Sequence, residues 1–192
     1  MNKYFKYFLF MLLLGLIVSL SLSFVNELTY PIIEEQKIKK VESSLLKVDN
    51  INKWVSGENL ININDDEKID SIYISKDENN KNNIVAYYII TKGYSNGNIE
   101  SIVFINYDNK EIVTIDIIYI ENQTKGIGSL IQDDPNYVKN FEKVNIKKYL
   151  NDNVNKHNSE SIDIISGATI SSRGVVEAVI IACNNFNKNV GN

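Results

Sequence analysis

The chain has very few of the residues on which several classes of protein depend. Its 192 residues include one cysteine, one histidine and two prolines. A single cysteine, Cys183, excludes an internal disulfide, a four-cysteine zinc site and an iron–sulfur cluster held by this chain alone. A single histidine, His157, excludes a histidine-rich site, so we expect no metal. His157 lies in a polar stretch and is predicted to be solvated, whereas Cys183 is predicted to lie in the core.

Positive charge is also scarce. Lysine and arginine together number 20 against 24 acidic residues, which gives a net charge of −4, and Arg173 is the only arginine. Nucleic-acid binding relies on a basic surface that neutralises phosphates, so the acidic balance excludes that function. The sequence has no dinucleotide-binding fingerprint either, and we therefore expect no NAD site.

A long uncharged run lies near the N-terminus. Residues 7–26 contain no charged side chain. About 20 apolar residues at 1.5 Å each match a hydrocarbon core of about 30 Å, which predicts a transmembrane helix over 7–26. Lys3 and Lys6 precede the run, so residues 1–6 are expected in the cytoplasm and the rest on the extracellular or periplasmic side of the cell membrane. A cleaved signal peptide is the alternative.

The remaining residues predict an α+β fold. Helical spacing predicts a membrane-proximal helix that begins at Pro31 and runs over 31–48, followed by a polar loop over 49–68. Alternating apolar residues predict strands over 70–76 and 100–107, a run of strand-forming residues predicts one over 83–92, and a tight turn leads into another over 111–120. Because short turns join them, these strands predict an antiparallel sheet. Two helices are expected to flank this sheet, over 134–150 and 169–186, with a polar loop over 151–161 between them. The predicted organisation is a membrane-proximal part over 27–83, one domain over 84–187 and a tail over 188–192.

One segment carries a chemical prediction. Residues 163–172 are DIISGATISS, in which a short apolar strand is expected to lead into the last helix. Ser166 can cap that helix, and Gly167 lets a bulky group approach the backbone. Thr169 would begin the helix, where unpaired N–H groups and the helix dipole favour an anion. The segment therefore predicts a phosphate-bearing ligand near Thr169, with plain helix capping as the alternative.

The same segment resembles the covalent-flavin motif of the FMN-binding domain family, in which Asp, two residues, Ser or Thr, Gly, Ala and Thr are followed by serines. Two further segments resemble that family: Lys-Gly-Tyr at 92–94, and QTKGIG at 123–128, which is similar to its Glu-Thr-Pro-Gly-Leu-Gly loop. The loop departs from the family at Gln123, Lys125 and Ile127, and Glu121 stands where a histidine is common.

The resemblance implies a specific cofactor site. The threonine hydroxyl of the family motif is joined to the phosphate of FMN by a phosphoester bond, and that role maps onto Thr169. A separate flavin transferase, which uses FAD, would install the cofactor. No catalytic residue is expected, and Arg173 either neutralises the phosphate or lies at the surface. The predicted cofactor-binding residues are Thr124, Gly126, Gly128, Asp163, Ser166, Gly167, Ala168, Thr169, Ser171 and Ser172.

The resemblance also implies a function. Family members include the G subunit of the Rnf complex, which passes electrons between ferredoxin and NAD and couples this to Na⁺ or H⁺ transport. We therefore expect a non-autonomous, FMN-carrying subunit of a redox-driven ion translocase, with the other subunits as partners. The alternatives are the C subunit of the Na⁺-translocating NADH:quinone reductase, a stand-alone membrane-tethered flavoprotein in extracellular electron transfer or sensing, and a structural domain without flavin.

Overall fold

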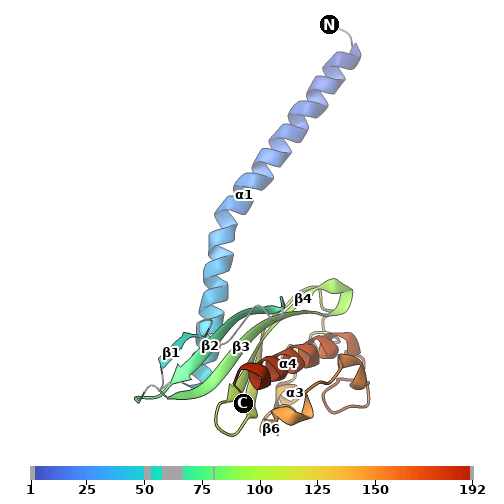
Figure 1. The fold of residues 1–192 in the computed structure, drawn as a ribbon. Helices are drawn as coiled ribbons and strands as arrows, with labels where there is room; N and C mark the ends of the chain where they lie inside the picture. Colours follow the sequence, from blue (N-terminus) through green and yellow to red (C-terminus); the bar gives the residue numbers. More distant parts are fainter. Residues whose placement is uncertain (1–2, 50–52, 58–66, 80, 191–192) are drawn as a thin grey trace. The chain divides into compact units, whose positions relative to one another are not determined.

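The computed structural model describes residues 3–49, 53–57, 67–79 and 81–190. The chain divides into two compact units, Met1–Ser43 and Ser44–Asn192. The first unit is helical, and the second holds the sheet with its helices (Figure 1). The α+β fold class with an antiparallel sheet, predicted from the sequence, is confirmed.

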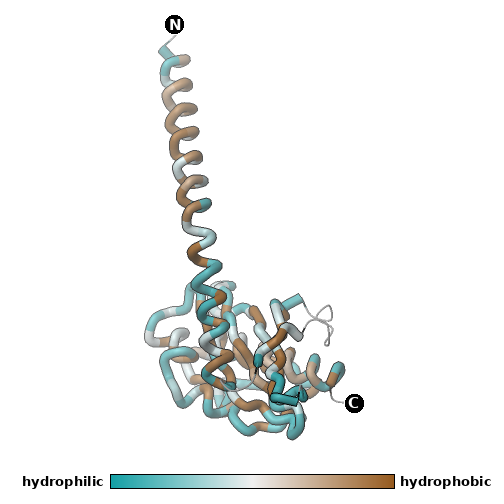
Figure 2. Tube along the Cα trace, turned by 90° about the vertical axis from the view of Figure 1, so that its left-hand side faces the viewer, coloured by the Kyte–Doolittle hydropathy of each residue, from teal (hydrophilic) through white to brown (hydrophobic). Residues whose placement is uncertain are grey.

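Helix α1 is longer than the sequence suggested. It runs without interruption over Lys3–Val48 and includes Pro31, so the prediction of a separate helix that begins at Pro31 is wrong. A proline inside a helix removes one backbone hydrogen bond, while the flanking turns keep theirs. The N-terminal half is apolar and exposed (Figure 2), and it is long and apolar enough to cross a membrane. This half of α1 is a candidate membrane anchor.

The sheet follows the order of the sequence. In the described residues it has six antiparallel strands, each paired with the next. They are β1 (Lys53–Ser56), β2 (Ile69–Lys76), β3 (Asn82–Lys92), β4 (Asn98–Asn106), β5 (Glu111–Ile120) and β6 (Val144–Asn145). The four predicted strands are confirmed as β2 to β5. Strand β1 lies inside the predicted loop 49–68, of which residues 50–52 and 58–66 fall outside the described part.

One face of the sheet packs against α4 (Thr169–Asn189), which confirms the predicted last helix (Figure 1). Tyr87 of β3 and Val103 of β4 are fully buried on this face. Val175, Val179 and Phe186 of α4 are fully buried in the same core. Burying such side chains stabilises the fold by roughly 1.5–3 kcal/mol each. The core therefore fixes α4 against the sheet, and with it the position of Thr169.

The opposite face is covered as well. Phe104 of β4 is fully buried there, and its ring meets the ring of Trp54 edge-on, with centroids 6.1 Å apart. The last residues of α1 reach the same face: Leu45 is buried, and the Ser44 hydroxyl donates a hydrogen bond of 2.5 Å to the Asp116 carboxylate. Both faces of the sheet are therefore shielded from water at its centre.

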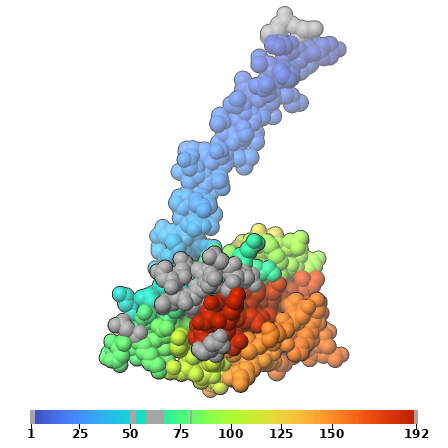
Figure 3. Space-filling model, viewed as in Figure 1, coloured from blue at the N-terminus to red at the C-terminus, as the bar shows by residue number. Residues whose placement is uncertain are grey.

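The segment between β5 and α4 differs from the prediction. Instead of one helix over 134–150 it forms short pieces, namely α2 (Leu130–Asp133), α3 (Pro135–Lys139), β6, and the 3-10 helices η3 (Ile146–Lys148) and η4 (Val154–Lys156). Lys143 adopts a left-handed conformation, with φ of 59°, which ends any helix. The Asn145 side chain then accepts a hydrogen bond from the N–H of Lys147 and starts η3. Of these pieces, α2, η3 and η4 pack beside α4, while α3 and β6 contact β5 (Figure 3).

Candidate functional site

The motif segment forms a turn that leads into α4. Residues 163–165 are not a strand, contrary to the expectation, although Ile164 is buried. Gly167 has φ of +85°, a conformation that glycine adopts without strain. Ser166 is exposed and does not cap the helix, because the capping position is Ala168 and no side chain bonds there. The N–H groups of the first turn of α4 are thus left without a side-chain cap, at the positive end of the helix dipole.

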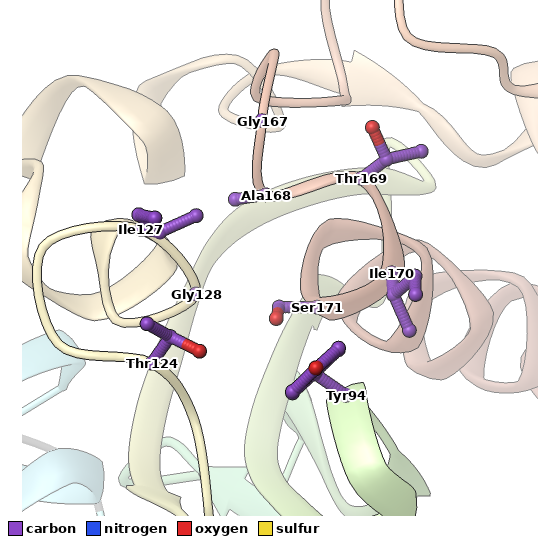
Figure 4. Close-up of a pocket in the computed structure, with 9 residues that line it drawn as sticks. All are labelled: Tyr94, Thr124, Ile127, Gly128, Gly167, Ala168, Thr169, Ile170 and Ser171. Atoms are coloured by element: carbon purple, nitrogen blue, oxygen red, sulfur yellow. The ribbon is translucent and has the colours of Figure 1, made fainter.

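A hollow of about 380 Å³ lies beside this turn (Figure 4). A cavity of this size is within the range of small-molecule and cofactor sites. Three segments line it: the turn after β3, the loop after β5 and the start of α4. Its lining residues are Tyr94, Thr124, Ile127, Gly128, Gly167, Ala168, Thr169, Ile170 and Ser171. The structure thus brings together six predicted site residues: Thr124, Gly128, Gly167, Ala168, Thr169 and Ser171.

Sequence reasoning missed the apolar part of the lining. Tyr94, Ile127 and Ile170 are 50%, 49% and 53% exposed, which is unusual for such large apolar side chains in a folded domain. They come from three different segments and face one hollow (Figure 4). Tyr94 and Ile127 lie inside segments that resemble the family, and this was the available signal. Together the three side chains offer an apolar surface to a flat aromatic ligand.

The Gln123 side chain connects the three segments that line the hollow through hydrogen bonds. Its side-chain oxygen accepts hydrogen bonds from the Ser171 hydroxyl and, at 3.3 Å, from the N–H of Tyr94. Its amide nitrogen donates to the carbonyl of Glu121 at 2.7 Å and to that of Tyr94 at 3.4 Å. A carboxylate could accept but could not donate, so this arrangement requires the amide. Gln123, which stands where the family loop has glutamate, is therefore part of the hydrogen bonding that assembles the site.

Gly128 lies where a side chain would disturb this arrangement. A Cβ atom at Gly128 would lie 3.0 Å from the Ser171 hydroxyl oxygen and 3.1 Å from the side-chain oxygen of Gln123. Both distances are shorter than an ordinary van der Waals contact. Glycine at this position thus allows the loop after β5 to approach the start of α4.

Four predicted site residues do not line the hollow. Ser166 is exposed beside it, and Gly126 has φ of +75° and donates its N–H to the Ser129 hydroxyl. Ser172 is fully buried, and its hydroxyl accepts a hydrogen bond of 3.1 Å from the N–H of Ile165. Asp163 is 1% exposed and contacts basic side chains in the interior. Ser172 and Asp163 therefore fix the motif segment through buried contacts on the side that does not face the hollow.

His157 is buried rather than solvated, which overturns the prediction. It is 6% exposed, and its Nδ1 lies 3.0 Å from the Asp163 carboxylate. Its backbone carbonyl accepts a hydrogen bond of 3.3 Å from Nε of Arg173. Cys183 is fully buried, as predicted, and burial raises the pKa of its thiol.

The described lining of the hollow contains no acidic, basic or histidine side chain. Elsewhere in the described residues, no cluster of three or more His, Cys, Asp or Glu side chains could hold a metal ion. The polarity of the hollow comes from hydroxyls and from the N–H groups at the start of α4. This donor set suits a phosphate near Thr169, and the three apolar side chains suit a flat ring, so the residues present fit FMN.

Comparison with known proteins agrees with this geometry. Residues 93–184 match the family model of the FMN-binding domain, so this part of the chain is an FMN-binding domain, and the hollow with its three lining segments lies within it. The family resemblance found in the sequence is thereby confirmed.

Among solved structures, the chain is similar to the crystal structure of NqrC from Shewanella oneidensis. The two share 21% sequence identity with a TM-score of 0.47, and the match covers 63% of this chain and 59% of that chain. The chain thus spans less than two thirds of the length of NqrC. A search of curated proteins finds no match.

Proposed function

We propose that this protein is a membrane-anchored electron carrier that holds FMN covalently through a phosphoester to Thr169. The proposal depends chiefly on one observation: in an FMN-binding domain, Thr169 is the first residue of α4 and lines the hollow. When bound, FMN supplies the electron-transfer chemistry through its isoalloxazine ring. The protein supplies the position and the electrostatic surroundings of that ring.

Each part of the hollow has a role in this proposal. The Thr169 hydroxyl oxygen forms the ester to the phosphorus of FMN and loses its proton when a transferase delivers the FMN half of FAD and AMP leaves. The uncapped N–H groups of α4 stabilise the phosphate charge. Tyr94, Ile127 and Ile170 line the hollow and would hold the ring and exclude water from part of it. No described side chain of the lining serves as a general acid or base.

The membrane anchor explains why a covalent bond is useful. Lys3 and Lys6 favour a cytoplasmic N-terminus, which places the flavin domain on the extracellular or periplasmic side. Free FMN that dissociates there is lost to a large volume, whereas a phosphoester cannot dissociate. Within this setting we assign the chain to an Rnf-type complex, as its FMN-carrying subunit, on the basis of the sequence motifs.

The test of the covalent bond is mass spectrometry of the chain produced together with a flavin transferase. The tryptic peptide that contains Thr169 should carry the added mass of FMN, and the band should fluoresce on a denaturing gel. Thr169→Ala should abolish the label, and Ser171→Ala should retain it. A label that survives Thr169→Ala and moves to another hydroxyl residue would refute the assignment.

The test of the complex is purification from native membranes. Co-purification with ferredoxin- and NAD-linked subunits supports the Rnf-type assignment, and quinone-linked partners would assign it to the quinone reductase instead. A flavin-loaded chain that purifies alone would make it a stand-alone carrier. Protease added to intact spheroplasts should remove the domain beyond the anchor, and protection of the domain there would reverse the proposed orientation.

A further inference from the structure

A cluster of ionisable side chains around the buried Asp163 lies behind the motif segment, outside the hollow. His157 has a carboxylate on each side: Nδ1 is 3.0 Å from Asp163 Oδ2, and Nε2 is 3.5 Å from Asp152 Oδ2. The imidazole also stacks on the ring of Tyr149, with centroids 5.7 Å apart and an interplanar angle of 21°. Lys148 lies 2.9 Å from Asp163 Oδ1. The cluster is thus built around the aspartate that opens the attachment motif.

The two sides of His157 are not equivalent. The Nδ1 contact with Asp163 is within hydrogen-bonding distance. The Nε2 contact is longer, and among the described residues neither Nε2 nor Asp152 Oδ2 has a hydrogen-bond partner. The contact that holds the motif segment is therefore the one made by Nδ1.

The cluster is connected to the start of α4 at several points. Arg173 Nε donates to the carbonyl of His157 at 3.3 Å, and the Tyr137 hydroxyl contacts both the Asp163 carbonyl, at 3.1 Å, and the Ser172 carbonyl, at 3.3 Å. The residues between Asp163 and Thr169 thus span from a buried, multiply contacted carboxylate to the first turn of the helix. A shift of Asp163 would therefore move the turn that presents the Thr169 hydroxyl.

We propose that His157 is a positioning residue for flavin attachment. Its Nδ1 holds the Asp163 carboxylate together with Lys148, and this contact fixes residues 163–168 so that Thr169 meets the transferase in one geometry. The inference rests on the proposed function, because it concerns how the attachment site is presented. His157 does not touch the hollow and acts through Asp163.

The experiment compares variants of His157 that each keep an amide group at the position of one of the two imidazole nitrogens. An asparagine amide can reach the place of Nδ1, and a glutamine amide the place of Nε2. We expect His157→Ala and His157→Gln to lower the initial rate of flavin loading by about tenfold or more, since small displacements at a reacting group cost rate steeply. His157→Asn should stay within about threefold of the wild type by the same reasoning. The full chain in detergent, the transferase and FAD are used throughout.

Two controls separate positioning from loss of stability. Ile74→Ala, a substitution of a buried residue in β2, should lower the melting temperature while leaving the loading rate of the folded chain unchanged. Hydrogen exchange should accelerate across 158–168 in His157→Ala and His157→Gln, and should stay as in the wild type in His157→Asn. Melting temperatures are measured for every variant.

The outcomes are distinct for the two proposals. Equal loading by His157→Ala and the wild type, or equal loading by the Asn and Gln variants, would overturn the role of His157. A wild-type chain that takes no covalent flavin would overturn the proposed function instead. In that case hydrogen exchange of residues 158–168 still tests whether Nδ1 of His157 fixes this segment. Unchanged hydrogen exchange in His157→Gln would overturn the inference.

Discussion

Replacing Gln123 by glutamate is the sharpest test of how the site is assembled. The substitution keeps the shape and exchanges the amide nitrogen for an oxygen. That nitrogen donates to the carbonyls of Glu121, at 2.7 Å, and Tyr94, at 3.4 Å. In Gln123→Glu a carboxylate oxygen would face two carbonyl oxygens, so two hydrogen bonds would disappear and repulsion would replace them.

The magnitude follows from the two hydrogen bonds that the substitution removes. A hydrogen bond contributes about 0.5–1.5 kcal/mol, so the absence of two lowers the free energy of unfolding by roughly 1–3 kcal/mol. For a domain of this size each kcal/mol corresponds to about 2–4 °C in melting temperature, which predicts a decrease of roughly 2–12 °C at neutral pH. The joint between the turn after β3, the loop after β5 and α4 would loosen, and flavin loading should fall with it.

The effect should depend on pH in a defined direction. The surrounding carbonyl oxygens disfavour the charged form, so the pKa of the new carboxyl is raised above the value of about 4.3 that it has in the unfolded chain. The folded state then binds the proton more tightly than the unfolded chain does. The loss of stability therefore begins as pH rises through the pKa of the unfolded chain, and it is complete above the pKa of the folded state. A protonated carboxyl can donate one hydrogen bond, so the melting temperature of the variant should approach that of the wild type near pH 4.

The assay is thermal unfolding of wild type and variant between pH 4 and 8. A Gln123→Glu chain as stable as the wild type at pH 7, with no pH-dependent difference, would refute the role assigned to the amide.

Three further predictions follow from the same structure. Gly97→Ala would place a Cβ atom 2.0 Å from the carbonyl oxygen of Glu121, so urea unfolding should show that the free energy of unfolding falls by about 3 kcal/mol. The control is Gly15→Ala, which has open space around it and should leave the unfolding of the domain unchanged. Cys183 should resist iodoacetamide in the folded chain at pH 8 and react once the chain is unfolded in urea, because burial raises the pKa of its thiol; rapid alkylation of the native chain would contradict its place in the core. Thr169→Ala should melt cooperatively without flavin and within about 1 kcal/mol of the wild type, because no side chain caps α4, and a non-cooperative transition would show that the fold needs its cofactor.

Strong periodicity explains which parts of the fold could be predicted from the sequence. Strands β2 to β5 have eight or more residues each that alternate or are rich in strand-forming residues, and α4 carries an apolar face along its length, so their type was clear from the chain alone. Strands β1 and β6 have four and two residues, too few for a pattern to show. The helix predicted over 134–150 ends at Lys139, and the left-handed backbone of Lys143, for which a lysine gives no local signal, keeps it from continuing further.

The site was predictable where its residues lie in short segments that resemble the family, as Thr124, Gly128 and Thr169 do. The attachment motif and Thr169 were found because they form one short segment next to a helix. Tyr94 and Ile170 face the same hollow only because the sheet brings the turn after β3 to the start of α4. His157 is buried between Asp152 and Asp163, and a polar stretch of sequence gives no sign of such an enclosed side chain.

The order of the elements along the chain also sets the order in which the domain can be completed. Strands β2 to β5 pair with their sequence neighbours, so these hairpins can form early, while the face that carries Tyr87 and Val103 stays open to water. That face is covered by α4, which follows the strands in synthesis and begins at Thr169, and by the short elements between β5 and α4. The proposed attachment residue therefore takes its final place in the same step that closes the core. Under the proposed attachment, a chain that stalls before this step would present Thr169 without the helix start and turn that surround it in the folded domain.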